Sequence, residues 1–159
     1  MKTILLVLIL TAINFAQSTS INLAGYDVEL GMNSETVWKL LSPIFLVSEN
    51  DEGNYYVSDK GENPVGIIIF KDDKVVKVIK DWGTTNKTNV GAVFKILWNI
   101  FRQYGEKSKI SEVIAKETFT PTGEKYSLFF TIDKYHYIEI NIFRNAAIYE
   151  VLEDQSGKF

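Results

Sequence analysis

The chain has 159 residues, of which 17 are lysine or arginine and 20 are aspartate or glutamate, and its net charge is −3. It contains no cysteine, which excludes disulfides, thiolate metal sites, a cysteine nucleophile and an acylated N-terminal cysteine. Charges of both signs are scattered along the sequence and form no basic stripe, so nucleic acid is not an expected partner.

The N-terminal residues have the pattern of a secretory signal peptide. One basic residue, Lys2, precedes an apolar run at positions 4–13, and a run of about ten apolar residues is typical of such signals. Polar residues then end the run well before the roughly twenty positions that a transmembrane helix needs. We expect residues 1–16 to be a signal peptide, cleaved after Ala16 or Ser18. A buried core segment is the alternative interpretation.

Removal of this segment takes Lys2 away and leaves 16 basic and 20 acidic residues, a net charge of −4. The remaining chain of about 140 residues is long enough to bury roughly two thirds of its unfolded surface without disulfides. We therefore expect one α+β domain over residues 21–153, followed by a loose tail at 154–159. The sequence predicts a soluble protein, secreted or periplasmic, with no lipid anchor and no integral membrane segment after signal removal.

In the first half of the chain, the pattern predicts one helix followed by strands. Tyr26–Val28 fits a short strand, and Asn33 or Ser34 is suited to cap a helix that Pro43 ends, because their side-chain oxygens accept hydrogen bonds from free first-turn amides. Polar turns then separate the strands expected in this half. They lie at residues 45–49, 54–58, 65–70 and 75–79, and Asp81-Trp82-Gly83 marks the end of the last.

The second half repeats this order. A long helix, capped by Thr88 or Asn89 and followed by Gly105, has one wide apolar face. The strands expected after it are residues 112–120, 125–132, 135–143 and 147–152. In the third of these, strand geometry directs Tyr135, Tyr137, Glu139 and Asn141 to one side, and His136, Ile138, Ile140 and Ile142 to the other.

These elements predict an α+β protein with two helices packed on antiparallel sheet(s) of about eight strands. All connections between strands are short enough for hairpins, which is why the sheets are expected to be antiparallel. The sequence leaves two arrangements open, one continuous curved sheet or two helix-plus-four-strand units.

The segment Tyr26–Leu41, which reads Tyr-Asp-Val-Glu-Leu-Gly-Met-Asn-Ser-Glu-Thr-Val-Trp-Lys-Leu-Leu, resembles the helix-opening segment of the SmpA/OmlA family of outer-membrane assembly lipoproteins. It is also similar to the corresponding segment of β-lactamase-inhibitor-protein-like domains. In both groups Gly-Met and a capping Ser or Thr precede a helix with Val and paired Leu. The resemblance implies a helix followed by an antiparallel sheet, and a periplasmic or secreted module that binds a protein.

The residues offer little for catalysis. His136 is the only histidine, and its position on an apolar strand face indicates a core residue. No Gly-x-Ser-x-Gly turn for a serine nucleophile occurs, and Asp72-Asp73 is interpreted as a hairpin turn. Glu49, Asp51 and Glu52 lack the spacing of a calcium loop. We predict no catalytic residue, no metal and no cofactor; a hydrolase using carboxylates such as Glu117 and Glu139 is the least favoured hypothesis.

Aromatic residues on the strands are the remaining functional signal. Tyrosine and tryptophan bury a large area in interfaces at a small entropy cost, and we select four such residues as a candidate binding surface: Tyr55, Trp82, Tyr135 and Tyr137. The alternative is that they simply cover the sheet. The sequence thus predicts a non-enzymatic exported module that binds another protein through sheet-face or hairpin-loop aromatics. The alternative function is a carrier of a small apolar ligand or lipid, held between the long helix and a curved sheet.

Overall fold

The computed structural model describes residues 19–86, 89–104 and 110–154. The predicted signal peptide, Thr88, Gly105 and most of the predicted tail lie outside the described residues. Within them are two helices, α1 (Ser34–Leu41) and α2 (Val90–Tyr104). The strands are β1 (Ser20–Leu23), β2 (Tyr26–Glu29), β3 (Leu46–Glu49), β4 (Tyr55–Ser58), β5 (Pro64–Lys71), β6 (Lys74–Asn86), β7 (Glu112–Thr120), β8 (Gly123–Thr131), β9 (His136–Ile142) and β10 (Asn145–Glu153).

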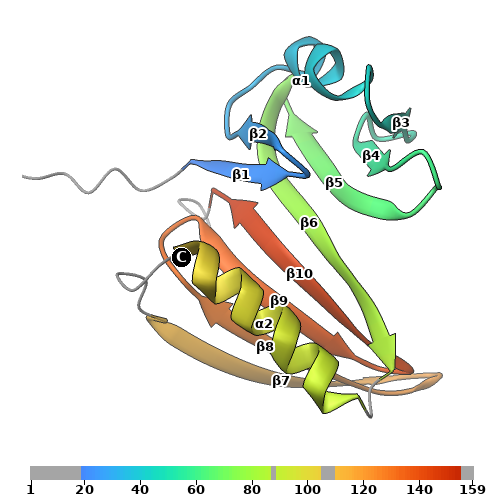
Figure 1. Cartoon of the computed structure of the whole chain (residues 1–159). Helices are drawn as coiled ribbons and strands as arrows, with labels where there is room; N and C mark the ends of the chain where they lie inside the picture. The colour runs from blue at the N-terminus through green and yellow to red at the C-terminus, as the bar shows by residue number, and fades with distance from the viewer. Residues whose placement is uncertain (1–18, 87–88, 105–109, 155–159) are drawn as a thin grey trace, which may run out of the picture.

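Eight of the strands form one antiparallel sheet in the order β3-β4-β5-β6-β10-β9-β8-β7, and β1 and β2 form a separate hairpin (Figure 1). The chain therefore passes twice through a helix and a four-strand meander, first α1 with β3–β6 and then α2 with β7–β10. The two meanders meet where β6 pairs with β10. The predicted α+β class is confirmed, and the sheet is both continuous and built from two helix-plus-four-strand units.

Helix α1 begins as its sequence predicts. The side-chain oxygen of Asn33 accepts a hydrogen bond from the amide of Thr36 at 2.8 Å, which satisfies one of the free first-turn donors. Val37 and Leu41 are fully buried, and the helix ends at Leu41, two residues before Pro43. This short amphipathic helix is held to the sheet by one apolar stripe.

Helix α2 is capped by Asn89, whose side-chain oxygen accepts a hydrogen bond from the amide of Ala92 at 3.0 Å. Its Ile100 is fully buried against Ile138, Ile140 and Ile148 of the sheet. In the parts of the chain that the structure describes, neither helix is long and apolar enough to cross a membrane.

The strand register shows that both helices pack on the same face of the sheet. Directly paired residues of antiparallel strands point to the same side, and Tyr55, Ile68, Val78, Leu152 and His136 are paired one after another across five strands. All five belong to the buried set. The first four share a core with α1 and the β1–β2 hairpin, and His136 is followed on its side of β9 by Ile138 and Ile140, which contact α2.

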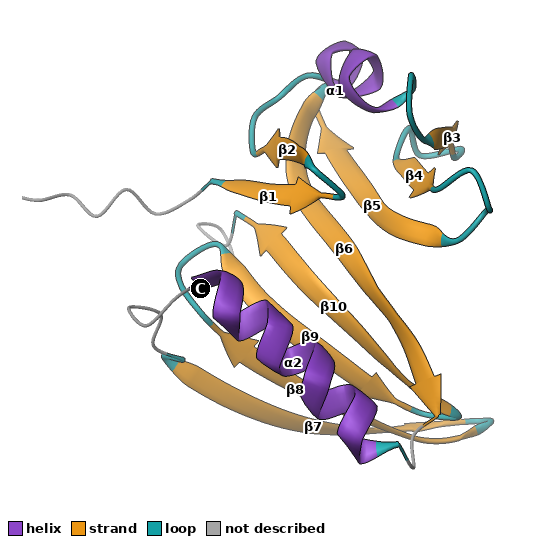
Figure 2. Ribbon diagram, viewed as in Figure 1, coloured by secondary structure: helices purple, strands orange, loops and turns teal. Residues whose placement is uncertain are grey.

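We call this side of the sheet the covered face, and the opposite side the open face. Figure 2 shows α2 and the β1–β2 hairpin on one side of the long strands. The hairpin contacts the sheet closely: a side-chain methyl of Leu23 lies 3.3 Å from the place that a Cβ on Gly66 would take. The carbonyl oxygen of Ile79 on β6 lies closer still, at 2.5 Å from the same place, so glycine at this position of β5 leaves room for both β6 and the hairpin.

Strand β6 corrects the prediction that the first meander ends at Asp81-Trp82-Gly83. The strand continues to Asn86 through a bulge, because its pairing with β10 shifts between Ala147 and Tyr149. Gly83 has φ of +102°, and its amide donates to the carboxylate of Asp81 at 2.6 Å. A bulge with a glycine at positive φ has the same local sequence as a strand-ending turn. Strand β1, which the sequence did not predict, pairs with β2.

Candidate binding surface

Of the four predicted surface residues, Tyr55 is buried and Trp82 is half-buried against the core. Tyr55 is only 6% exposed, and its ring packs edge-on between Trp38 and Phe70 at centroid distances of 5.7 and 4.8 Å. Trp82 packs against the second core, and its indole nitrogen donates to the carboxylate of Glu150 at 2.8 Å. Both side chains therefore stabilise the covered face.

The other two predicted residues, Tyr135 and Tyr137, lie apart from each other. Tyr135 lies in the turn before β9 and packs against the first core. Tyr137 lies on the open face, where its hydroxyl donates to the carboxylate of Glu153 at 3.0 Å and accepts from the ammonium group of Lys77 at 3.2 Å. Burial, and then the negative charge of Glu153, raise the pKa of Tyr137. The four predicted residues thus do not form one surface, although Tyr137 marks where a surface lies.

A row of apolar and aromatic side chains crosses five strands of the open face through Tyr137. Each residue of the row is directly paired with the next, in the order Tyr56, Ile67, Ile79, Val151 and Tyr137. Tyr56 at one end is 45% exposed, Ile67 and Ile79 are half-buried, and Val151 is buried.

A second row lies next to the first and alternates acidic residues with aromatic ones before it ends in an isoleucine. It runs through Asp81, Tyr149, Glu139, Phe129 and Ile114, again by direct pairing. The rows touch where the rings of Phe129 and Tyr137 lie 6.3 Å apart. An antiparallel sheet with one solvated face normally carries polar side chains there. The apolar content of these two rows is instead typical of a contact surface.

The charges directly beside Tyr149 on the open face are negative, whereas Lys77 and Lys116 lie farther along the same face. Glu153 is paired with Lys77 at 3.2 Å, whereas Asp81 and Glu139 form no ion pair within the described residues. Burial, and then the charges of Asp81 and Glu139, raise the pKa of the Tyr149 hydroxyl between them. The centre of the face therefore combines an aromatic ring with two carboxylates that accept hydrogen bonds from the Gly83 amide and the Asn141 side chain but form no ion pair within the described residues.

The covered face contains a buried polar cluster, centred on Glu150. Its carboxylate accepts from the hydroxyl of Tyr104 at 2.5 Å and from Trp82, and the ammonium group of Lys80 lies 3.6 Å away. The Glu150 side chain is 4% exposed, and burial, together with this carboxylate, raises the pKa of Tyr104. The cluster fixes the C-terminal end of α2 to β6 and β10, and its burial indicates a structural role.

His136 lies beside this cluster and is 1% exposed, as its interpretation as a core residue predicts. Its Nδ1 lies 3.0 Å from both carboxylate oxygens of Asp133, and its Nε2 lies 3.1 Å from the carbonyl oxygen of Ser20. Burial opposes ionisation of the imidazole, but the hydrogen bond and charge of Asp133 outweigh it and raise the pKa of His136. This pair links the β9 turn to β1.

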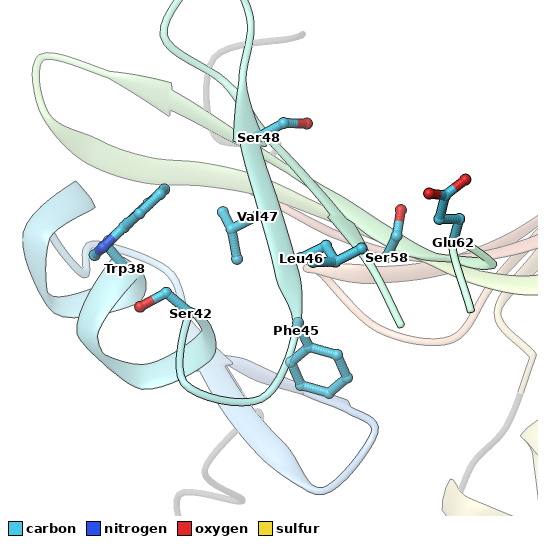
Figure 3. A pocket seen from close by; sticks show the side chains of 8 residues that line it. All are labelled: Trp38, Ser42, Phe45, Leu46, Val47, Ser48, Ser58 and Glu62. Atoms are coloured by element: carbon cyan, nitrogen blue, oxygen red, sulfur yellow. The ribbon is translucent and has the colours of Figure 1, made fainter. Parts of the chain in front are cut away.

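The two carboxylates considered for catalysis and the contact of α2 with the sheet can also be located in the structure. The register directs Glu117 to the covered side and Glu139 to the open face, so these carboxylates do not converge. Side chains of α2 fill its contact with the sheet. An open hollow of about 520 Å³ lies elsewhere, between α1 and β3 (Figure 3). It is lined by Trp38, Ser42, Phe45, Leu46, Val47, Ser48, Ser58 and Glu62.

No family model, curated protein or solved structure matches this chain. The candidate surface therefore rests on the geometry alone. Sequence reasoning missed Tyr56, Ile67, Ile79, Phe129 and Tyr149. The signal that indicates them is the alternation within each strand, since each is a neighbour in sequence of a side chain on the covered face.

Proposed function

We propose that this protein is a non-enzymatic binding module that holds another protein against the open face of its sheet. The observation that carries this proposal is the uninterrupted row from Tyr56 to Tyr137 on a face that neither helix covers. Aromatic and aliphatic side chains in the centre of a surface provide most of the energy in protein interfaces. The resemblance of Tyr26–Leu41 to secreted and periplasmic binding modules agrees with this function and with export. Export itself stays a prediction.

The partner that suits this face presents basic residues next to apolar ones. Asp81 and Glu139 flank Tyr149 in the register, and complementary charges accelerate association and favour the right partner. A lysine or arginine near Tyr149 also gains a cation–π contact with its ring. We therefore propose a protein partner with a basic and apolar contact surface.

Photocrosslinking tests the proposal. A photoreactive phenylalanine analogue is incorporated in place of Tyr149, and crosslinking is carried out in the cells that produce the protein. In a control variant the same analogue replaces Lys60, which is exposed in the turn between β4 and β5. We expect a discrete adduct at position 149 whose linked peptide is basic, no such adduct at position 60, and loss of the adduct in Glu139→Lys. Equal adducts at both positions, or an adduct that Glu139→Lys leaves unchanged, would contradict the proposal.

The alternative function, a small apolar ligand held between α2 and the sheet, stays a prediction. The side chains that meet there are packed, with Ile100 fully buried against three isoleucines of the sheet, so a ligand must displace them. Titration with a fluorescent fatty acid tests this alternative, which predicts binding that an Ile100→Trp variant abolishes.

A further inference from the structure

The two edges of the sheet differ in length and in exposure. Strand β3 at one edge has four residues, whereas β7 at the other has nine and is exposed along nearly its whole length. Its Val113, Ile114 and Phe119 are 56%, 46% and 74% exposed. A long edge strand presents unpaired backbone donors and acceptors that pair readily with another strand. The β7 edge therefore needs a partner strand or some protection against one.

The sequence of β7 is complementary to itself. When Glu112-Val113-Ile114-Ala115-Lys116 is placed antiparallel to a second copy with Ile114 opposite Ile114, Glu112 lies opposite Lys116 and Val113 opposite Ala115. Glu112, Ile114 and Lys116 all lie on the open face, since their β8 partners Thr131, Phe129 and Ser127 alternate with those of the covered side. Opposite charges in directly paired positions stabilise a strand pair, and like charges destabilise it.

Neighbouring registers lack this complementarity. Centring the pair on Lys116 or on Glu117 places a like charge against itself. Centring it on Ala115 places Ile114 against Lys116 and Val113 against Glu117. In the described part of the chain, neither Glu112 nor Lys116 belongs to an ion pair, so both charges are available to a second copy.

We propose that two copies of this chain pair through their β7 strands, antiparallel, with Ile114 on the two-fold axis. A two-fold contact uses the same patch on both copies, which a self-complementary strand provides. The pairing joins the two eight-stranded sheets edge to edge and leaves both open faces on the same side. It uses the β7 edge and shares only Ile114, the end of the row, with the row through Tyr149. The crosslink at position 149 and the dimer contact at position 114 are therefore measured separately, and either proposal can fail without the other.

Sedimentation velocity and charge reversal test the pairing. We expect the wild type to dimerise with concentration, and Glu112→Lys or Lys116→Glu alone to weaken the dimer about tenfold or more, because each creates two like-charge pairs across the axis. The double variant carries the reversed but again complementary pattern and should restore the dimer. Lys125→Glu, a charge change on β8 outside the contact, is the control and should leave the dimer intact.

Cysteine crosslinking tests the register. The chain has no native cysteine, so Ile114→Cys introduces a single thiol, which the proposed axis places opposite its own copy within disulfide reach. The same register separates two Thr118→Cys positions by eight residues, about 27 Å, so only Ile114→Cys should form covalent dimers on mild oxidation. A wild type that is monomeric at every accessible concentration, a double variant no better than the single ones, or equal crosslinking at both positions would overturn the proposal.

Discussion

The covered and open faces of this sheet are made from the same strands but have different chemistry. On the covered face, Ile68, Val78 and Leu152 are completely buried, and the polar groups between them are matched with partners, as for Glu150 and His136. On the open face, Ile67 and Ile79 are only partly buried although Val151 is buried, and the carboxylates of Asp81 and Glu139 lack ion-pair partners within the described residues. The comparison indicates that the first face stabilises the fold and that the second is available for contact.

The largest expected effect is the loss of Glu150 on the covered face. Glu150→Ala leaves Lys80 as an uncompensated charge and removes the acceptor for Trp82 and Tyr104, and breaking such a buried pair costs about 3–5 kcal/mol of unfolding free energy. Urea denaturation measures this. Glu150→Gln keeps an acceptor in place and should cost less; an Ala variant as stable as the wild type would contradict the structural role of the cluster.

Adjacent isoleucines of β5 give a matched comparison of the two faces. Ile68 is fully buried on the covered face, so Ile68→Ala should cost about 2–5 kcal/mol. Ile67, one residue earlier, points to the open face and is half-buried, so Ile67→Ala should cost about 1 kcal/mol. Chemical denaturation of the two variants measures the difference. Equal losses would mean that the open face is also part of the core.

The His136–Asp133 pair makes the stability of the covered face depend on pH. The pKa of His136 is raised and that of Asp133 is lowered, so the pair contributes fully between the unfolded-state values of about 3.9 for Asp and about 6.5 for His. Its contribution is lost as pH rises through the folded-state pKa of His136. Asp133→Asn keeps an acceptor oxygen but removes the charge, and should cost about 1.5–3 kcal/mol near pH 6 and clearly less at about pH 9. A cost that is the same at both pH values would contradict the ionic role of the pair.

The smallest effect on stability is expected for charges of the open face. Glu139→Lys leaves the core untouched, so the unfolding free energy should change by less than about 0.5 kcal/mol. The substitution should instead lower the rate of association with a basic partner, and this rate should depend less on salt concentration than that of the wild type. Surface plasmon resonance at two salt concentrations measures this with the partner that is captured at position 149. An unchanged rate would contradict the charge complementarity.

Much of the fold follows from local patterns in the sequence. Polar and Gly-containing turns predicted the hairpins, the capping residue Asn33 located α1, and the alternation in β9 correctly separated Tyr137 from His136. These features depend on neighbouring residues, and local rules describe them well. The β7 strand was predicted at its observed bounds.

The candidate surface depends on long-range pairing, which local patterns do not determine. The pairing of Ile79 with Val151 joins residues from different meanders, and no local signal specifies it. Trp82 was assigned to the surface because the bulge at Gly83 resembles a strand end, whereas the bulge directs its ring to the core. Tyr55 and Tyr56 are adjacent tyrosines, and only the register shows which of them is buried.

The central claim is that the partner binds the open face through Tyr149. Calorimetric titration with the purified partner, identified by crosslinking at position 149, tests this claim most directly. It compares the wild type with Tyr149→Ala on the open face and with Phe94→Ala, an aromatic residue of α2 that is 66% exposed on the other side of the molecule. We predict that Tyr149→Ala weakens binding at least about tenfold, as expected for an aromatic residue in the centre of an interface, and that Phe94→Ala leaves it unchanged. Binding that survives Tyr149→Ala and is lost in Phe94→Ala would show that the partner binds α2 and not the open face.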